Sequence, residues 1–247
     1  MKDQYFGDSN DYRKYGLLRA LQSKGHGTLL VAWMLTPDDG SRDGGSRSYL
    51  RDPTTWERYD PELFAGLAHL LRSAPTPKVS LIEAAGLLSN TSYYSDVVQD
   101  RRDCRDAWRQ GMFDAARNVD LVFLDPDNGI EVPSKQVGRK GSSKYVAWHE
   151  IEVLWAAGCS VLIYQHFPRK PHKAFAERMV SELRRHTGAC VTEAFRTRHV
   201  LFLLAAQERH EPGVRDVIAL LKERWNSQIE PMGLANKPLQ PPGFAGG

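Results

Sequence analysis

The sequence predicts an α/β protein with a doubly wound, mostly parallel sheet, helices on both of its faces and a terminal antiparallel hairpin. Short apolar runs rich in β-branched and aromatic residues recur along the chain, and amphipathic helical segments alternate with them. The last two runs are separated only by a short polar turn, which is typical of a hairpin. Continuous apolar runs indicate strands that are buried on both faces, as in parallel sheets.

The expected elements follow from this pattern in chain order. Apolar runs predict strands at residues 29–35, 79–83, 119–124, 158–164, 189–195 and 200–206. Apolar side chains at helical spacing predict helices at residues 11–21, 61–71, 100–116, around 149–155, 173–185 and 214–225. We expect one domain over residues 1–230, followed by a poorly ordered Pro/Gly-rich tail over residues 231–247.

Composition limits the class of protein. With 247 residues and 41% hydrophobic content, the chain can bury the core of one large domain. The net charge of +3 is too small to indicate nucleic acid by itself. Cys104, Cys159 and Cys190 are too widely spaced for a disulfide framework or a zinc site, so no metal centre is expected from them. The absence of a long apolar run or a signal-type N-terminus predicts a soluble, cytoplasmic protein.

The strongest candidate site follows the strand expected at residues 119–124. Asp125, Pro126, Asp127 and Asn128 come directly after this apolar run, and Gly129 allows the chain to turn. Ligands of open α/β sheets bind at the carboxyl edge of the strands. We therefore expect Asp125, Pro126, Asp127 and Asn128 to form the catalytic centre.

Three other residues are candidates for binding a cofactor. Lys14 lies on the first expected helix, and Gly40 belongs to a glycine-rich loop after the first strand that could approach a ligand closely. Glu83 ends the strand expected at residues 79–83. In nucleotide-binding α/β folds, an acid at such a strand end takes a ribose hydroxyl.

A basic loop at residues 134–144 is the candidate surface for nucleic acid. Lys135, Arg139, Lys140 and Lys144 lie there among glycines and serines, next to the proposed catalytic edge. Ammonium and guanidinium groups bind phosphates and release counterions. Phe167, after the strand expected at residues 158–164, is an aromatic group on which a base could stack.

Several of these segments resemble one family, the ribosomal-RNA adenine-N6 methyltransferases of the RlmJ type and related Rossmann-like class I methyltransferases. Gly7-x-x-x-Asp11-x-x-Lys14 is similar to the family's N-terminal Gly-x-x-x-Asp-x-x-Lys segment. Gly40 falls where the first glycine of its cofactor loop occurs, and Asp125 begins the segment that corresponds to Asp-Pro-Pro-Tyr. The resemblance covers most of the chain at the level of element order.

The resemblance implies an S-adenosylmethionine cofactor that lies against Lys14. It also implies that Asp125 and the carbonyl group of Pro126 accept hydrogen bonds from a target amine, so that its lone pair faces the methyl group. The chain departs from the family where Asp127 and Asn128 replace a proline and an aromatic residue, so that stacking would have to come from a residue such as Phe167. Thr36 also replaces the acid that opens the family's cofactor loop.

Three functions therefore remain open from the sequence. The first is an S-adenosylmethionine-dependent methyltransferase that acts on an amino group of a nucleic-acid base. The second is a nuclease or phosphohydrolase in which Asp125, Asp127 and Glu131 bind Mg²⁺ through hard oxygen ligands. The third is a non-catalytic protein of methyltransferase-like fold that binds nucleic acid or a partner.

Overall fold

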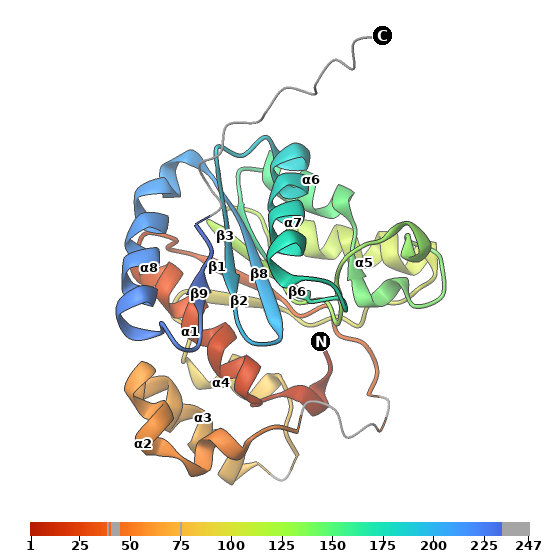
Figure 1. The fold of residues 1–247 in the computed structure, drawn as a ribbon. Coiled ribbons are helices and arrows are strands. Elements are labelled where there is room, and N and C mark those ends of the chain that lie inside the picture. Colours follow the sequence, from red (N-terminus) through yellow and green to blue (C-terminus); the bar gives the residue numbers. More distant parts are fainter. Residues whose placement is uncertain (39, 41–44, 75, 234–247) are drawn as a thin grey trace.

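The structure is a computed structural model that describes residues 1–38, 40, 45–74 and 76–233. Its centre is a seven-stranded sheet with the strand order β2-β1-β3-β6-β8-β7-β9 (Figure 1). The strands are β1 (Leu29–Ala32), β2 (Thr91–Tyr94), β3 (Leu121–Leu124), β6 (Ser160–His166), β7 (Val191–Arg196), β8 (Val200–Ala206) and β9 (Glu230–Pro231). Strands β2, β1, β3 and β6 are parallel, whereas β8 is antiparallel to both β6 and β7.

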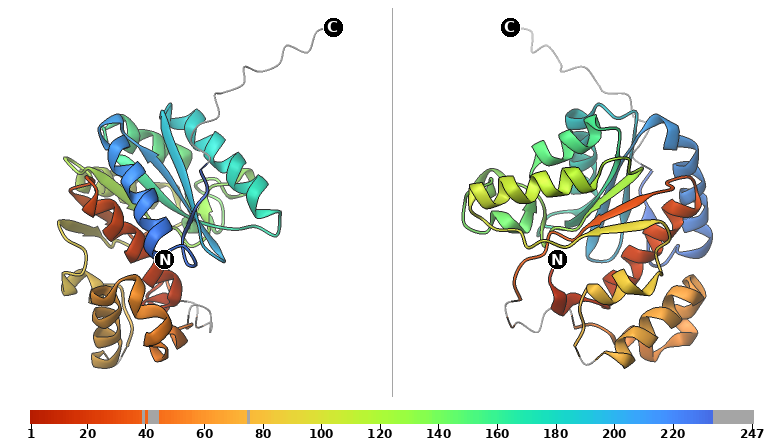
Figure 2. Two further views of the ribbon diagram at one scale, coloured as in Figure 1. Left: turned by 60° about the vertical axis from the view of Figure 1, so that its left-hand side comes forward. Right: turned by 180° about the vertical axis from the view of Figure 1, so that it is seen from behind.

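Helices cover both faces of this sheet (Figures 1 and 2). They are α1 (Ser9–Ser23), α2 (Pro53–Trp56), α3 (Pro61–Ser73), α4 (Ser80–Ala85), α5 (Arg102–Ala115), α6 (Trp148–Ala156), α7 (His172–Thr187) and α8 (Glu211–Arg224). Helices α1, α3 and α8 share one hydrophobic core with one face of the sheet. Helices α5, α6 and α7 share the second core with the other face.

The central strands alternate between the two cores, which explains why they are apolar throughout. In β3, Leu121 and Phe123 belong to the first core, whereas Val122 and Leu124 belong to the second. All four residues are completely buried. The strand pairing confirms the expected α/β class with a mostly parallel sheet and a final antiparallel hairpin. The central strand β3 could be predicted because a strand between two cores needs apolar side chains on both faces.

The strand expected at residues 79–83 is wrong. These residues enter α4, a short helix that ends at Gly86, whose φ of 65° is left-handed. The strand beside β1 is instead β2, a stretch of small and aromatic residues that alternates poorly in hydrophobicity. Periodicity could not separate these short segments, because contacts with α3 and β1 decide their conformation.

Two further expectations concern Arg105 and the C-terminal tail. Arg105 is expected on the exposed face of a charged helix, but its side chain is only 1% exposed and pairs with Glu150 of α6 at 2.6 Å. Pro231, placed in the tail, pairs with Phe195 as part of β9. Residues 234–247, the rest of the expected tail, lie outside the described residues.

Candidate functional site

The loop after β3 lies at the carboxyl edge of the sheet, where the side chain of Gln165, near the end of β6, forms hydrogen bonds with the backbone of the loop. Gly129 has a φ of 124°, and a Cβ atom there would lie 2.3 Å from the side-chain oxygen of Gln165. That oxygen accepts a hydrogen bond from the Ile130 amide at 2.9 Å, and Nε2 of Gln165 donates to the Asn128 carbonyl oxygen at 3.2 Å. Glycine is thus required for this close approach, which fixes the loop that begins at Asp125.

Helix α1 brings the N-terminal motif to the same edge. The Asp8 carboxylate accepts hydrogen bonds from the amides of Asn10 and Asp11 at 2.7 and 2.9 Å, and thereby caps the helix. The Gly7 amide donates to Oδ2 of Asp11 at 2.8 Å. Because residues three apart lie on one side of a helix, Asp11 and Lys14 face the sheet together.

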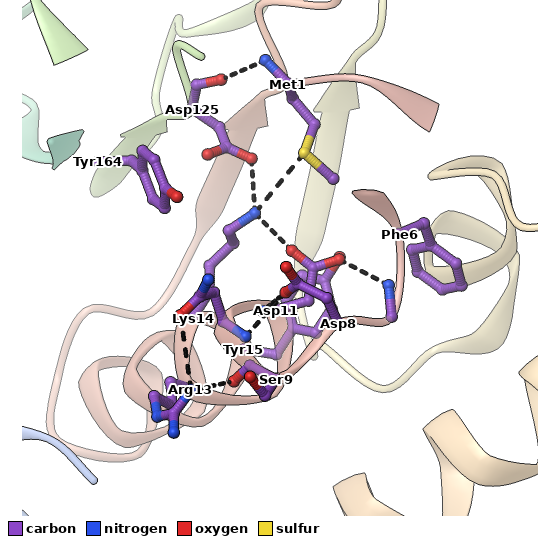
Figure 3. A network of polar contacts seen from close by, with 12 residues as sticks. Met1, Phe6, Asp8, Ser9, Asp11, Arg13, Lys14, Tyr15, Asp125 and Tyr164 are labelled. Carbon is purple, nitrogen blue, oxygen red and sulfur yellow. Dashed lines mark hydrogen bonds and ion pairs between the residues drawn. The ribbon is translucent and has the colours of Figure 1, made fainter. Parts of the chain in front are cut away.

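Lys14 joins α1 to the end of β3 (Figure 3). Its Nζ atom lies 2.7 Å from Oδ1 of Asp11 and 2.7 Å from Oδ2 of Asp125. The side chains of Lys14, Asp11 and Asp125 are only 3%, 3% and 2% exposed. Burial lowers the pKa of Lys14, but the two carboxylates more than offset this and raise it above its ordinary value. Lys14 is therefore a buried cation held between two anions.

Three oxygen atoms at the same edge surround the α-ammonium group of Met1. It lies 2.7 Å from Oδ1 of Asp127, 3.0 Å from the Asp125 carbonyl oxygen and 3.2 Å from the Met34 carbonyl oxygen. We call these three oxygens the ammonium cage. The Thr36 hydroxyl donates to the other Asp127 oxygen at 2.7 Å. Burial raises the pKa of Asp127, but the Met1 ammonium and this hydroxyl outweigh burial and lower it.

A cavity of about 290 Å³ lies between α1, the loop after β3 and the end of β6. Its wall contains all four predicted catalytic residues together with Lys14. The other lining residues are Met1, Tyr5, Asp8, Asn10, Asp11, Lys144, Tyr164 and His166. The cavity therefore brings together the four predicted catalytic residues and Lys14, one of the predicted cofactor-binding residues.

A basic groove adjoins this cavity and shares Asn128 and Lys144 with it. The groove also contains Lys2, Thr36, Pro37, Asp100, Lys135, Lys140, Gly141, Ser143 and Tyr145. Asp100 accepts hydrogen bonds from the Gly141 and Ser143 amides at 2.6 and 2.8 Å, which fixes this part of the loop. Three of the four predicted phosphate-binding residues thus line one groove beside the cavity.

Other predicted residues lie outside the cavity and the groove. Arg139 lines neither of them. Phe167 stacks on His172, with ring centroids 3.9 Å apart and planes at 8°. This contact covers one face of the Phe167 ring, so a base could stack only on its other face.

The two remaining cofactor candidates are also outside the cavity wall. Gly40 has a φ of 68° and open space around the position of a Cβ atom. Residues 39 and 41–44 beside it lie outside the described part of the chain. Glu83 lies on α4, where its carboxylate accepts hydrogen bonds from the Trp33 indole at 2.8 Å and the Ser95 hydroxyl at 2.6 Å. Contact of Gly40 or Glu83 with a cofactor stays a prediction.

The acids proposed for Mg²⁺ do not gather into one ligand set. In the described ranges, no group of three or more His, Cys, Asp or Glu side chains could hold a metal ion. Glu131 accepts a hydrogen bond from the Trp148 amide at 2.9 Å, at the start of α6. Asp127 is engaged by Met1 and Thr36.

Sequence reasoning missed several residues of the cavity wall, among them Asp8, Asn10 and Tyr5. Asp8 could have been found from its place just before the first helix, because aspartate is a preferred N-cap. Tyr164 ends the strand expected at residues 158–164, and His166 follows it at an edge that the sequence predicts could bear on a substrate. Their approach to Lys14 depends on the pairing of β6 with β3, which no local pattern shows.

The fold and this edge define an α/β protein with a cavity at the carboxyl ends of parallel strands, and several charged side chains line this cavity. Searches of the sequence against models of known families and against curated proteins found no match. Over the part of the chain that the structure describes, no helix is long and apolar enough to cross a membrane.

Proposed function

We propose that this protein is an S-adenosylmethionine-dependent methyltransferase that acts on an amino group of a nucleic-acid base. The observation that carries the proposal is the cavity at the carboxyl ends of β3 and β6, because Asp125, Pro126 and Lys14 all line it. Ligands of open α/β sheets bind at this edge. The antiparallel strand β8 between β6 and β7 also agrees with the class I methyltransferase fold that the sequence resembles.

The ammonium cage fits the amino-acid part of the cofactor. The cage holds a primary ammonium group. S-Adenosylmethionine also carries an ammonium group on a methionine skeleton. The Asp127 carboxylate and the carbonyl groups of Met34 and Asp125 would hold that ammonium group once Met1 moves away. The cofactor would supply an electrophilic methyl group.

Asp125 is the residue that would orient the target amine. Lys14 holds its Oδ2 atom at 2.7 Å, whereas no hydrogen bond from the described residues reaches Oδ1. Oδ1 and the Pro126 carbonyl oxygen are therefore the acceptors for the two amine hydrogens, which leaves the nitrogen lone pair free to attack. Lys14 is a positioning residue in this scheme, because it fixes the Asp125 carboxylate. Burial raises the pKa of Asp125, and the Lys14 ammonium opposes that rise.

The basic groove would bind the phosphate backbone next to the target base. Lys135, Lys140 and Lys144 lie along it, and Lys144 also reaches the cavity. Tyr164 is in the cavity wall and takes the place of the aromatic residue that Asn128 replaces. It is a better candidate for contact with the base than Phe167, one face of which is covered by His172.

Calorimetry with S-adenosylmethionine tests the cofactor, and transfer of a radiolabelled methyl group to mixed RNA and DNA tests the reaction. Wild type should bind the cofactor and transfer the label. Asp125→Asn should still bind the cofactor but lose transfer by about a hundredfold or more, as expected for removal of a group that acts in the transition state. No binding of S-adenosylmethionine to wild type would overturn the cofactor assignment. Undiminished transfer by Asp125→Asn would overturn the role of Asp125.

A further inference from the structure

Four carboxyl groups line the cavity, and three of them already contact a cation. Asp11 and Asp125 share Lys14, with both distances at 2.7 Å. Asp127 pairs with the Met1 ammonium at 2.7 Å. Asp8 has no ion-pair partner among the described residues, although its residue surface is only 8% exposed. The cavity therefore contains one buried acid whose negative charge is not matched by contact with a cation.

The surroundings of Asp8 make its negative charge costly in the absence of a ligand. Its Oδ1 atom accepts two backbone hydrogen bonds at the start of α1, and the carboxylate of Asp11 belongs to the same first turn. Burial, followed by the carboxylate of Asp11, raises the pKa of Asp8 to about 7. Other titratable or charged groups surround Asp8 across the cavity, on α1 and in the helical layer. They are Met1, Tyr5, Arg13, Lys14, Tyr15, Tyr49, Asp125, Asp127, Lys144, Tyr164 and His166.

We propose that Asp8 is the residue that distinguishes S-adenosylmethionine from S-adenosylhomocysteine, because its carboxylate stabilises the positive sulfonium charge that only the first of them carries. This inference rests on the proposed function. A positive charge brought into the cavity favours the carboxylate over the carboxylic acid, so binding expels the proton of Asp8. After methyl transfer the sulfur is neutral, and Asp8 can take up a proton again. Asp8 would thus make the affinity for the product, S-adenosylhomocysteine, lower than the affinity for S-adenosylmethionine.

The other acids are poorly suited to this role. Lys14 already contacts both Asp11 and Asp125 at 2.7 Å, and Asp127 is occupied by an ammonium group and the Thr36 hydroxyl. Each of these three acids therefore already has a cation at contact distance, which Asp8 lacks. Asp8 is also open to a clean test, because asparagine caps a helix about as well as aspartate. Asp8→Asn removes the charge and keeps the cap.

The experiment is calorimetry of S-adenosylmethionine and S-adenosylhomocysteine at pH 6 and pH 8, with wild type, Asp8→Asn and Asp52→Asn. Asp52 is the matched control, because it caps α2 through the Thr55 amide and lies outside the cavity wall. With a pKa of about 7, the affinity of wild type for S-adenosylmethionine should fall about tenfold from pH 8 to pH 6, relative to Asp8→Asn. Titration of the ligand itself is common to both proteins and cancels.

S-Adenosylhomocysteine should show no such difference between wild type and Asp8→Asn. In two buffers of different ionisation enthalpy, wild type and Asp52→Asn should release a proton on binding S-adenosylmethionine near pH 6.5, whereas Asp8→Asn should release less. If both ligands bind but the pH dependence and proton release are the same in Asp8→Asn as in wild type, the role of Asp8 is overturned while the proposed function stands. If neither ligand binds to wild type at either pH, the proposed function itself fails and this inference fails with it.

Discussion

The ammonium group of Lys14 lies 2.7 Å from the carboxylate of Asp125, although 111 residues separate them in the chain. One belongs to the first helix and the other follows a central strand. Both side chains are almost completely buried. This contact joins the two motifs that carry the resemblance to amino methyltransferases. Each residue compensates the buried charge of the other, so both are important for the stability of the folded protein.

Removal of Lys14 should therefore destabilise the fold. Lys14→Met leaves two carboxylates without their cation in a buried site, which should lower the free energy of unfolding by about 3 to 5 kcal/mol. The double variant Lys14→Met, Asp125→Asn should recover part of this loss, because one of the uncompensated charges is gone. Urea denaturation measures both. Arg117→Met, which breaks an exposed pair with Asp114, is the control and should change stability little. A Lys14→Met variant as stable as wild type would contradict the importance of the pair.

The buried pair of Arg105 and Glu150 should hold the basic loop in place. Arg105 also donates to the Tyr145 carbonyl oxygen at 2.9 Å, and Glu150 accepts from the Ala147 amide at 2.9 Å. Glu150→Gln should destabilise the protein by about 3 kcal/mol, because it leaves the Arg105 charge unpaired. Amide hydrogen exchange should rise between residues 133 and 147 more than in β3. Unchanged exchange in this loop would show that the pair does not anchor it.

Gly129 should tolerate no side chain, even alanine. Its φ of 124° disfavours alanine, and the Gln165 amide occupies the place of a Cβ atom. Gly129→Ala should cost more than about 1 kcal/mol of stability and weaken cofactor binding, because the loop with Asp125 must shift. Gly158→Ala is the matched control, since Gly158 has a φ of 88° but nothing within 4 Å of a Cβ atom. Equal losses in the two variants would mean that backbone strain alone is responsible.

Stability should fall in acid because of a buried histidine pair far from the cavity. The rings of His26 and His210 lie 4.5 Å apart, and Nε2 of His26 has no hydrogen-bond partner among the described residues. Burial, followed by His210, lowers the pKa of His26 from 6.5 to about 4. The unfolded chain therefore takes up a proton below pH 6.5 that the folded chain takes up only near pH 4.

The stability linked to His26 is thus fully present above pH 6.5 and is lost as the pH falls toward 4. The loss should reach up to about 3 kcal/mol. Urea midpoints measured between pH 7 and pH 4 should fall less steeply for His26→Leu. His69→Leu, at an exposed position of α3, is the control for the substitution itself. An identical slope in His26→Leu and wild type would exclude His26 as the source.

The salt dependence of nucleic-acid binding should distinguish the lysines of the basic groove from Arg139, which lies outside the groove. If the groove binds phosphates, Lys140→Ala and Lys144→Ala should each reduce the slope of log K against log salt by about 0.7 to 0.9 for nucleic-acid binding. Arg139→Ala should leave the slope unchanged, because Arg139 does not line the groove. Titrations of a single-stranded oligonucleotide at several salt concentrations provide the measurement. An effect of Arg139→Ala equal to that of Lys144→Ala would indicate a loop that acts only through its net charge.

The sequence by itself predicted the elements in which the pattern of apolar residues reflects which faces are buried. The apolar run before Asp125 forms β3, because burial of both faces of a strand leaves a continuous apolar run. The segment with Lys14 forms α1, because burial of a helix face leaves apolar residues at helical spacing. It also predicted that Asp125 to Asn128 would lie at a sheet edge. All four line the cavity, together with Lys14.

Only the tertiary structure decided which of several plausible segments lies where. Residues 79–83 have the stronger local signal for a strand, yet they enter the helix α4, which packs on α3. The less apolar segment of β2 is a strand because it pairs with β1. Asp8 carries no pattern of its own beyond an N-cap, and its unmatched charge exists only because Lys14 is already shared by Asp11 and Asp125. Local periodicity records which face of an element is buried, whereas the charge balance of a cavity depends on distances between residues far apart in the chain, which folding alone fixes.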